Sequence, residues 1–240
     1  MQALLPFISP ILLAFGFWRF LVKPDDIWLI SVLSIALIIL TVKILAKRHF
    51  FGFFRLWINL SIVYLAQILF LIILNVNSLR YLLTVLWIGI WYLVFLLIAK
   101  YFKNLKNIND FDYLAFTRFL YYLSFWLLAS SLYYLIIFIN FSLWWTLAIL
   151  LLTAGFFAKE ILLLSEKISS KLLWLLLFSL GQLLLALYLM PISFYLAGTI
   201  ACLWLFFFLE WNLFGQKGFL KFFWLFVGAI ALLLLSSLPF

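Results

Sequence analysis

Long apolar runs alternate with short polar breaks along the chain. Each run has about the 20 residues that an α-helix needs to cross the hydrocarbon core of a bilayer. The breaks contain Lys, Arg, Asp, Glu, Asn or Pro, whereas the runs between them are almost continuously apolar. This pattern predicts nine membrane-spanning helices, at about 3–22, 27–46, 56–75, 81–99, 119–139, 143–162, 172–190, 193–211 and 219–238.

The composition agrees with a membrane protein. Hydrophobic residues make up 70% of the 240 positions, charged residues 10%, and the mean hydropathy is +1.32. A soluble domain is about half apolar and about a quarter charged. The strands of a membrane barrel would alternate polar and apolar residues, whereas a helix satisfies its own backbone within an apolar run. We therefore expect an all-α polytopic bundle of about nine transmembrane helices, as a single membrane-embedded domain over residues 1–240.

The basic residues predict the orientation of this bundle. If nine spans alternate in direction, every second connection lies on the same side of the membrane as the N-terminus. Thirteen of the sixteen Lys and Arg residues lie in or beside these connections, and the other three are Arg19, Lys23 and Arg80. By the positive-inside rule the N-terminus is cytoplasmic and the C-terminus is outside. The expected location is a plasma or inner membrane.

The net charge of +9 has to be interpreted within this topology. The basic residues occur singly or in small groups between apolar blocks, as at Lys47–Arg48, and form no continuous basic surface. Such groups are typical of contacts with anionic lipid headgroups. The expected partners are therefore membrane lipids at the cytoplasmic face and another membrane protein, but no nucleic acid.

Two glutamines are the most polar residues deep inside the predicted spans. Gln67 lies in the third span and Gln182 in the seventh, at similar depth, because both spans run in the same direction. Amides at such positions either bond neighbouring helices or line a ligand cavity. Gln67 and Gln182 are thus a predicted intramembrane polar site, and interhelical bonding is the alternative that we favour. The middles of all nine spans lack ionisable residues, which argues against a proton-driven pump.

A pair of acids follows the first span. Asp25 and Asp26 resemble the acidic motif of polytopic glycosyltransferases that use polyprenyl-phosphate sugars, and the resemblance covers these two residues. It implies that a carboxylate serves as a base or binds a metal near the lipid phosphate. The alternative, which we favour, is a turn and helix N-cap, because Pro and Asp are common where a helix begins.

The remaining candidates predict structural roles. Asp110 and Asp112 form a D-x-D motif, but the loop that contains them has 19 residues, too few for a nucleotide-binding fold. His49 has no second histidine or nearby cysteine with which to bind a metal or haem. Small residues four apart, Ala197/Ala201 and Gly198/Cys202, predict close helix packing in the eighth span. We therefore expect no cofactor and no metal.

The sequence leaves three functions open. The first is a non-enzymatic membrane subunit, assembly factor or scaffold, which the missing catalytic motifs favour. The second is a carrier or permease for a lipid or small apolar solute, which predicts a cavity at Gln67 or Gln182. The third is an enzyme that acts on a lipid-linked substrate through Asp25 and Asp26.

Overall fold

The computed structural model describes residues 5–46, 50–103, 111–165 and 169–213. These residues contain eight helices that are long and apolar enough to cross a membrane, which confirms the all-α class. The predicted ninth span, at 219–238, lies outside the described residues, as do His49 and Asp110.

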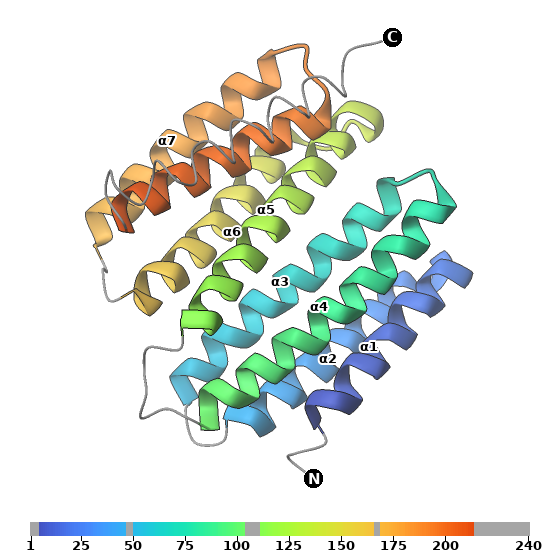
Figure 1. Cartoon of the computed structure of the whole chain (residues 1–240). Coiled ribbons are helices and arrows are strands. Elements are labelled where there is room, and N and C mark those ends of the chain that lie inside the picture. Colours follow the sequence, from blue (N-terminus) through green and yellow to red (C-terminus); the bar gives the residue numbers. More distant parts are fainter. Residues whose placement is uncertain (1–4, 47–49, 104–110, 166–168, 214–240) are drawn as a thin grey trace. The chain divides into compact units, whose positions relative to one another are not determined.

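The eight helices match the first eight predicted spans (Figure 1). A short 3₁₀ turn, η1 (Pro24–Asp26), joins the first two. In chain order the helices are α1 (Leu5–Val22), α2 (Ile27–Ala46), α3 (Phe50–Ile73), α4 (Asn77–Lys103), α5 (Phe111–Ile139), α6 (Leu143–Leu164), α7 (Ser170–Leu189) and a last helix, Phe194–Leu213.

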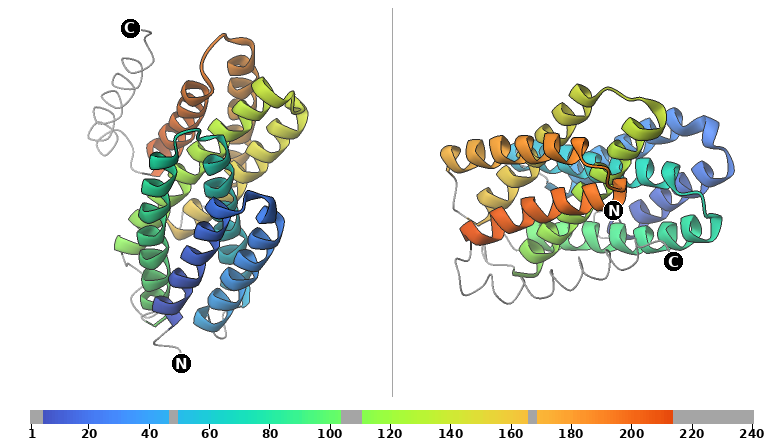
Figure 2. Two further views of the ribbon diagram at one scale, coloured as in Figure 1. Left: turned by 90° about the vertical axis from the view of Figure 1, so that its right-hand side faces the viewer. Right: turned by 90° about the horizontal axis from the view of Figure 1, so that it is seen from above.

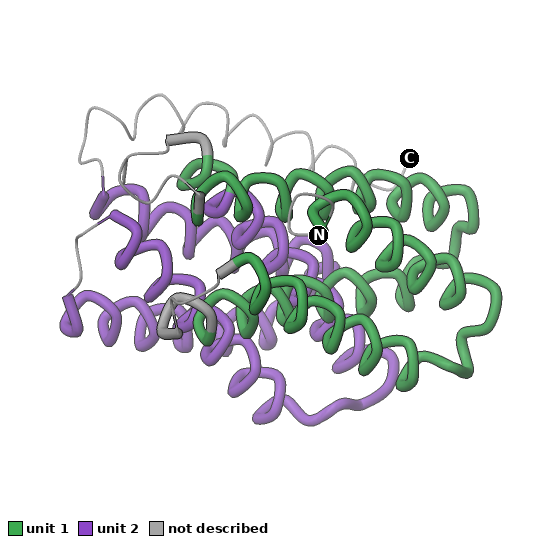
Figure 3. Tube along the Cα trace, turned by 90° about the horizontal axis from the view of Figure 1, so that it is seen from below, with its two compact units in different colours: residues 1–116 green, residues 117–240 purple. Residues whose placement is uncertain are grey.

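The chain divides into two compact units, residues 1–116 and 117–240 (Figure 3). Unit 1 contains α1 to α4, and unit 2 contains most of α5 together with α6, α7 and the Phe194–Leu213 helix. The expectation of a single membrane domain over residues 1–240 stays a prediction.

In unit 1 the four helices run up and down beside one another (Figure 2). Helix α1 contacts both α2 and α4, and α2 also contacts α3. Large aromatic side chains fill the centre of this unit: Phe17, Tyr64, Trp91 and Phe95 are each 0% exposed. The Tyr64 ring of α3 lies 5.2 Å from the Phe17 ring of α1 and 6.3 Å from the Trp91 ring of α4, so the aromatic core joins α1, α3 and α4.

In the described part of unit 2, helix α5 contacts each of the other three helices. Its Tyr121 ring stacks on Phe157 of α6 with the centroids 4.5 Å apart. Its Tyr133 hydroxyl donates to the backbone oxygen of Leu184 in α7 at 2.8 Å. Its Tyr134 ring packs edge-on against Phe194, 5.2 Å away, at the start of the last helix. Helix α5 is therefore the element around which unit 2 is built.

The turn between α5 and α6 has a defined helix end. Asn140 has a φ of 54°, and the amide of Phe141 donates to the carbonyl of Leu135 at 3.1 Å. A residue in the left-handed region commonly ends a helix, and here the amide that follows it bonds back to a carbonyl of the preceding turns. Asparagine tolerates that conformation better than most residues, which explains why a polar residue ends the run at this point.

Candidate functional site

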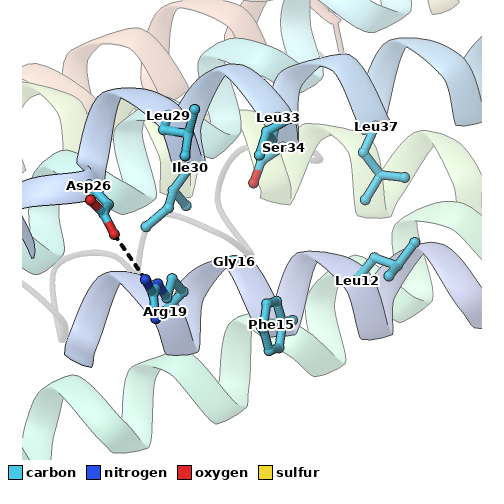
Figure 4. A pocket seen from close by; sticks show the side chains of 10 residues that line it. All are labelled: Leu12, Phe15, Gly16, Arg19, Asp26, Leu29, Ile30, Leu33, Ser34 and Leu37. Carbon is cyan, nitrogen blue, oxygen red and sulfur yellow. Dashed lines mark hydrogen bonds and ion pairs between the residues drawn. The ribbon is translucent and has the colours of Figure 1, made fainter. Parts of the chain in front are cut away.

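A groove lies between α1 and α2 in unit 1, with a volume of about 450 Å³ (Figure 4). Its walls are apolar and come from both helices: Leu12, Phe15, Leu29, Ile30, Leu33 and Leu37. Several of them remain largely exposed; Phe15 is 68% and Leu29 64% exposed. The groove therefore opens on the surface that meets the membrane.

The floor of the groove forms where α1 and α2 come close together. A Cβ added to Gly16 would lie 2.9 Å from the Ser34 hydroxyl, so only glycine fits here without a shift of Ser34. The Ser34 oxygen in turn accepts a hydrogen bond from the Tyr64 hydroxyl at 2.9 Å. That polar group is thus already bonded, and the hollow offers mainly hydrocarbon contacts along its length.

One end of the groove is charged. Arg19 and Asp26 both line it, and the Arg19 Nη2 lies 3.2 Å from the Asp26 Oδ2. Their side chains are 44% and 39% exposed, and Figure 4 shows them at the same end of the hollow. An exposed ion pair of this kind contributes little to stability, about 0–1 kcal/mol, but it provides one group of each sign at the mouth of an apolar groove.

The two acids of the predicted pair have different environments. Asp26 bonds Arg19 and lines the groove, whereas Asp25 is exposed and does not line it. Both lie in the 3₁₀ turn that begins with Pro24, so the predicted turn is present. The catalytic role that the glycosyltransferase resemblance implies for Asp25 and Asp26 stays a prediction.

The two glutamines have different environments. Gln67 is 0% exposed, and its Oε1 accepts a hydrogen bond from Trp91 Nε1 at 2.8 Å, which joins α3 to α4. Its Nε2 is buried and has no hydrogen-bond partner within the described part of the chain. Gln182 lies in unit 2 with an exposed side chain. The Trp91 bond supports interhelical bonding for Gln67, and neither glutamine lines the groove.

A buried ionic cluster lies in unit 2. The Arg118 Nη1 of α5 is 3.2 Å from one carboxylate oxygen of Glu210, and their side chains are 10% and 7% exposed. The Tyr122 hydroxyl donates to the other oxygen, Oε1, at 3.1 Å. Tyr122 follows Arg118 by one helical turn, so both reach the same carboxylate from one face of α5.

This cluster is one end of a polar seam along the two helices. The seam continues every four residues on α5, from Arg118 and Tyr122 to Trp126 and Ser130. Trp126 Nε1 donates to Thr199 Oγ1 at 3.0 Å, and the Cys202 thiol donates to the backbone oxygen of Tyr122 at 3.2 Å. At Ser130 the last helix presents Gly198, where an added Cβ would lie 2.7 Å from the Ser130 amide nitrogen. The close packing expected of the small residues is thus present.

The ionic cluster was not predicted from the sequence. Arg118 and Glu210 both lie at predicted span ends, where charges are expected to be solvated. Hydropathy cannot show that two such residues, 92 positions apart, bury each other. A usable signal was present in the spacing of Arg118, Tyr122 and Trp126, which puts three groups able to hydrogen-bond on one face of a predicted helix.

These features define an integral, multi-pass membrane protein of the all-α class. The eight described helices and their apolar outer surfaces establish this much. In comparisons with protein-family models, curated proteins and solved structures, no match to the chain is found.

Proposed function

We propose that this protein is a non-enzymatic component of a membrane assembly: a subunit, assembly factor or scaffold. The observation that supports the proposal is that polar side chains inside the helices form hydrogen bonds to neighbouring helices. Ser9 bonds Thr41, Tyr64 bonds Ser34, and Trp91 bonds Gln67, each pair joining two helices of unit 1. These polar groups hold the bundle together, which is their usual role between membrane helices.

The outward faces support the same proposal. Helix α7 exposes Trp174, Phe178 and Leu189, which are 73%, 68% and 80% exposed, and α4 exposes Val85, which is 66% exposed. Surfaces of this kind contact lipid tails or the helices of another membrane protein. A subunit recognised through its helices needs such a surface and no catalytic constellation.

The test is a site-specific photo-crosslink in the native membrane. A photoreactive phenylalanine analogue would replace Phe178 in one variant and Val85 in another. We expect one of these variants to give a stoichiometric adduct with a single membrane protein, and gentle purification followed by mass spectrometry should recover the same protein with the wild-type chain.

A matched control uses Leu86, which follows Val85 on α4, is 53% exposed and points about 100° away from Val85 around the helix. A true interface should give an adduct at some of these exposed positions and not at others. Lipid adducts alone at all three positions, with no stoichiometric partner after purification, would contradict the proposal.

The groove between α1 and α2 favours a second candidate, a carrier or permease for a lipid or small apolar solute. An apolar hollow of about 450 Å³ that opens to the membrane is of the size that small-molecule sites have. The purified protein in vesicles should then speed the exchange of a fluorescent lipid between leaflets, and an unchanged exchange rate would argue against this candidate.

We further propose that the chain lies in a plasma or inner membrane with a cytoplasmic N-terminus, and that its cytoplasmic face meets anionic headgroups. The thirteen-to-three distribution of Lys and Arg supports this orientation. In a Cys202→Ala background, Ser78→Cys and Phe141→Cys should react with an impermeant thiol reagent added outside. Phe50→Cys and Leu105→Cys should react after the membrane is opened. The reverse pattern would invert the orientation, and a mixed pattern would contradict the number of spans.

A further inference from the structure

We propose that the groove between α1 and α2 is a binding site for one zwitterionic phospholipid, with an acyl chain along the groove and the headgroup on Arg19 and Asp26. This site is independent of the subunit role proposed above, because it needs no protein partner. Its support comes from the length of the groove, the nature of its walls and the charges at one end.

The length of the groove matches one leaflet. The lining begins at Asp26, the last residue of η1 directly before α2, and ends at Leu37 of α2, eleven residues further on. At about 1.5 Å per residue this is about 16 Å, and half of a hydrocarbon core of about 30 Å is about 15 Å. A chain that starts at the Asp26 end therefore reaches the middle of the bilayer where the groove ends.

The walls suit hydrocarbon. Leu12, Leu33 and Leu37 line the part of the groove away from the charged end, as Figure 4 shows. The Ser34 hydroxyl, the main polar group along this part, already accepts the bond from Tyr64. An acyl chain in the groove therefore meets no unbonded polar group, and it covers Leu33, which is otherwise 61% exposed.

The charged end suits a headgroup that carries both signs. The guanidinium of Arg19 matches the geometry of a phosphate, to which it can donate two hydrogen bonds. The carboxylate of Asp26, 3.2 Å from that guanidinium, is placed to accept from an ammonium group. An anionic phospholipid would satisfy Arg19 but place no cation on Asp26, so the pair selects a zwitterionic lipid.

The experiment is native mass spectrometry of the purified full-length protein after exchange into equimolar phosphatidylethanolamine and phosphatidylglycerol. We expect one phosphatidylethanolamine to remain bound when the other lipids are stripped by collision. Asp26→Asn should shift the retained lipid toward phosphatidylglycerol, because Arg19 still holds the phosphate. Arg19→Gln should lower retention of both lipids about tenfold, the loss expected for one hydrogen bond between charged groups.

Two tryptophan variants test whether the lipid lies in the groove. Leu33→Trp fills the hollow and should abolish retention. Val32→Trp is the matched control, since Val32 is the neighbouring residue on α2, is 65% exposed and does not line the groove; this variant should retain the lipid as the wild type does. Circular dichroism of both variants shows whether each has folded.

Other outcomes would overturn the site. Equal retention by the Leu33→Trp and Val32→Trp variants would mean that the lipid binds elsewhere on the surface. Retention without preference, unchanged by Asp26→Asn, would mean ordinary surface lipid. A second copy of the chain that protects the groove from lipid would also overturn it. If Leu33→Trp does not fold, the Asp26 and Arg19 variants decide, because these residues lie at the exposed end.

Discussion

Replacing Glu210 with Leu should lower the free energy of unfolding by about 3–5 kcal/mol, the usual cost of removing one member of a buried ion pair. The variant leaves the Arg118 guanidinium buried beside an apolar side chain where a carboxylate had been, and Tyr122 loses its acceptor. Reversible unfolding in mixed micelles, followed by circular dichroism, measures the change.

The chain contains its own control for this prediction. The Arg19–Asp26 pair has the same nitrogen–oxygen distance, 3.2 Å, but its side chains are 44% and 39% exposed, against 10% and 7% for Arg118 and Glu210. Asp26→Asn should therefore cost no more than about 1 kcal/mol. The triple variant Arg118→Met, Tyr122→Phe, Glu210→Leu should recover most of the loss, because apolar groups can replace a buried pair. Equal effects of Glu210→Leu and Asp26→Asn would show that the buried pair is hydrated.

Adding a single methyl group, in Gly198→Ala, should cause the second largest loss in the free energy of unfolding, after Glu210→Leu. In Gly198→Ala the new Cβ would collide with the Ser130 hydroxyl, and it would also lie 2.7 Å from the Ser130 amide nitrogen and 3.0 Å from its Cα, both of them backbone atoms. Because backbone cannot move aside as a side chain does, α5 and the last helix must separate. The expected loss of stability is about 1–3 kcal/mol, typical of overpacking, in the same unfolding measurement.

Gly89→Ala provides the matched comparison. Gly89 lies within α4, and a Cβ added there meets nothing within 4 Å. The substitution should stabilise the protein by up to about 1 kcal/mol, because Ala favours the helix over Gly. Opposite signs at the two glycines are thus expected. Adding Ser130→Ala to Gly198→Ala should recover only part of the loss, since the backbone contacts remain, and full recovery would mean that only the hydroxyl collides.

The spans could be predicted from the sequence because the bilayer imposes one requirement on each of them. Hydropathy placed the third span at 56–75 and the fifth at 119–139, whereas α3 begins at Phe50 and α5 at Phe111. The difference arises because a helix can continue beyond the hydrocarbon core, where its residues need not be apolar. For the same reason α6 continues without a break through Lys159 and Glu160.

The pairing of helices could not be predicted in the same way. The polar side chain of Gln67 in an apolar run indicated a bond to another helix, but nothing in the pattern selected Trp91 as its donor. Span depth also suggested Gln182 as a partner of Gln67, although the Gln182 side chain is exposed. The depth of a residue in the membrane follows from the position of its own span in the sequence. The helices that it contacts depend on how all helices of the unit pack together.

The groove between α1 and α2 also could not be predicted from the sequence. Asp26 was a candidate because of its neighbour Asp25, yet in the structure its partner is Arg19, seven residues earlier. The short connection between the first two spans does predict that residues on either side of it come together. The hollow beside them forms where Gly16, which lacks a side chain, faces the Ser34 side chain, and the rotation of each helix about its own axis decides whether these two residues face each other.

The separation of 92 positions between Arg118 and Glu210 has a consequence for how the protein is made. At about 5–20 residues per second, translation needs roughly 5–18 s to pass from one to the other. During this interval the pair cannot form, and the Arg118 side chain has to extend toward the membrane surface, as long cationic side chains do. The ionic bond therefore closes late in biogenesis, after the ribosome has delivered the Phe194–Leu213 helix, and a chain truncated before Glu210 would lack this carboxylate beside Arg118.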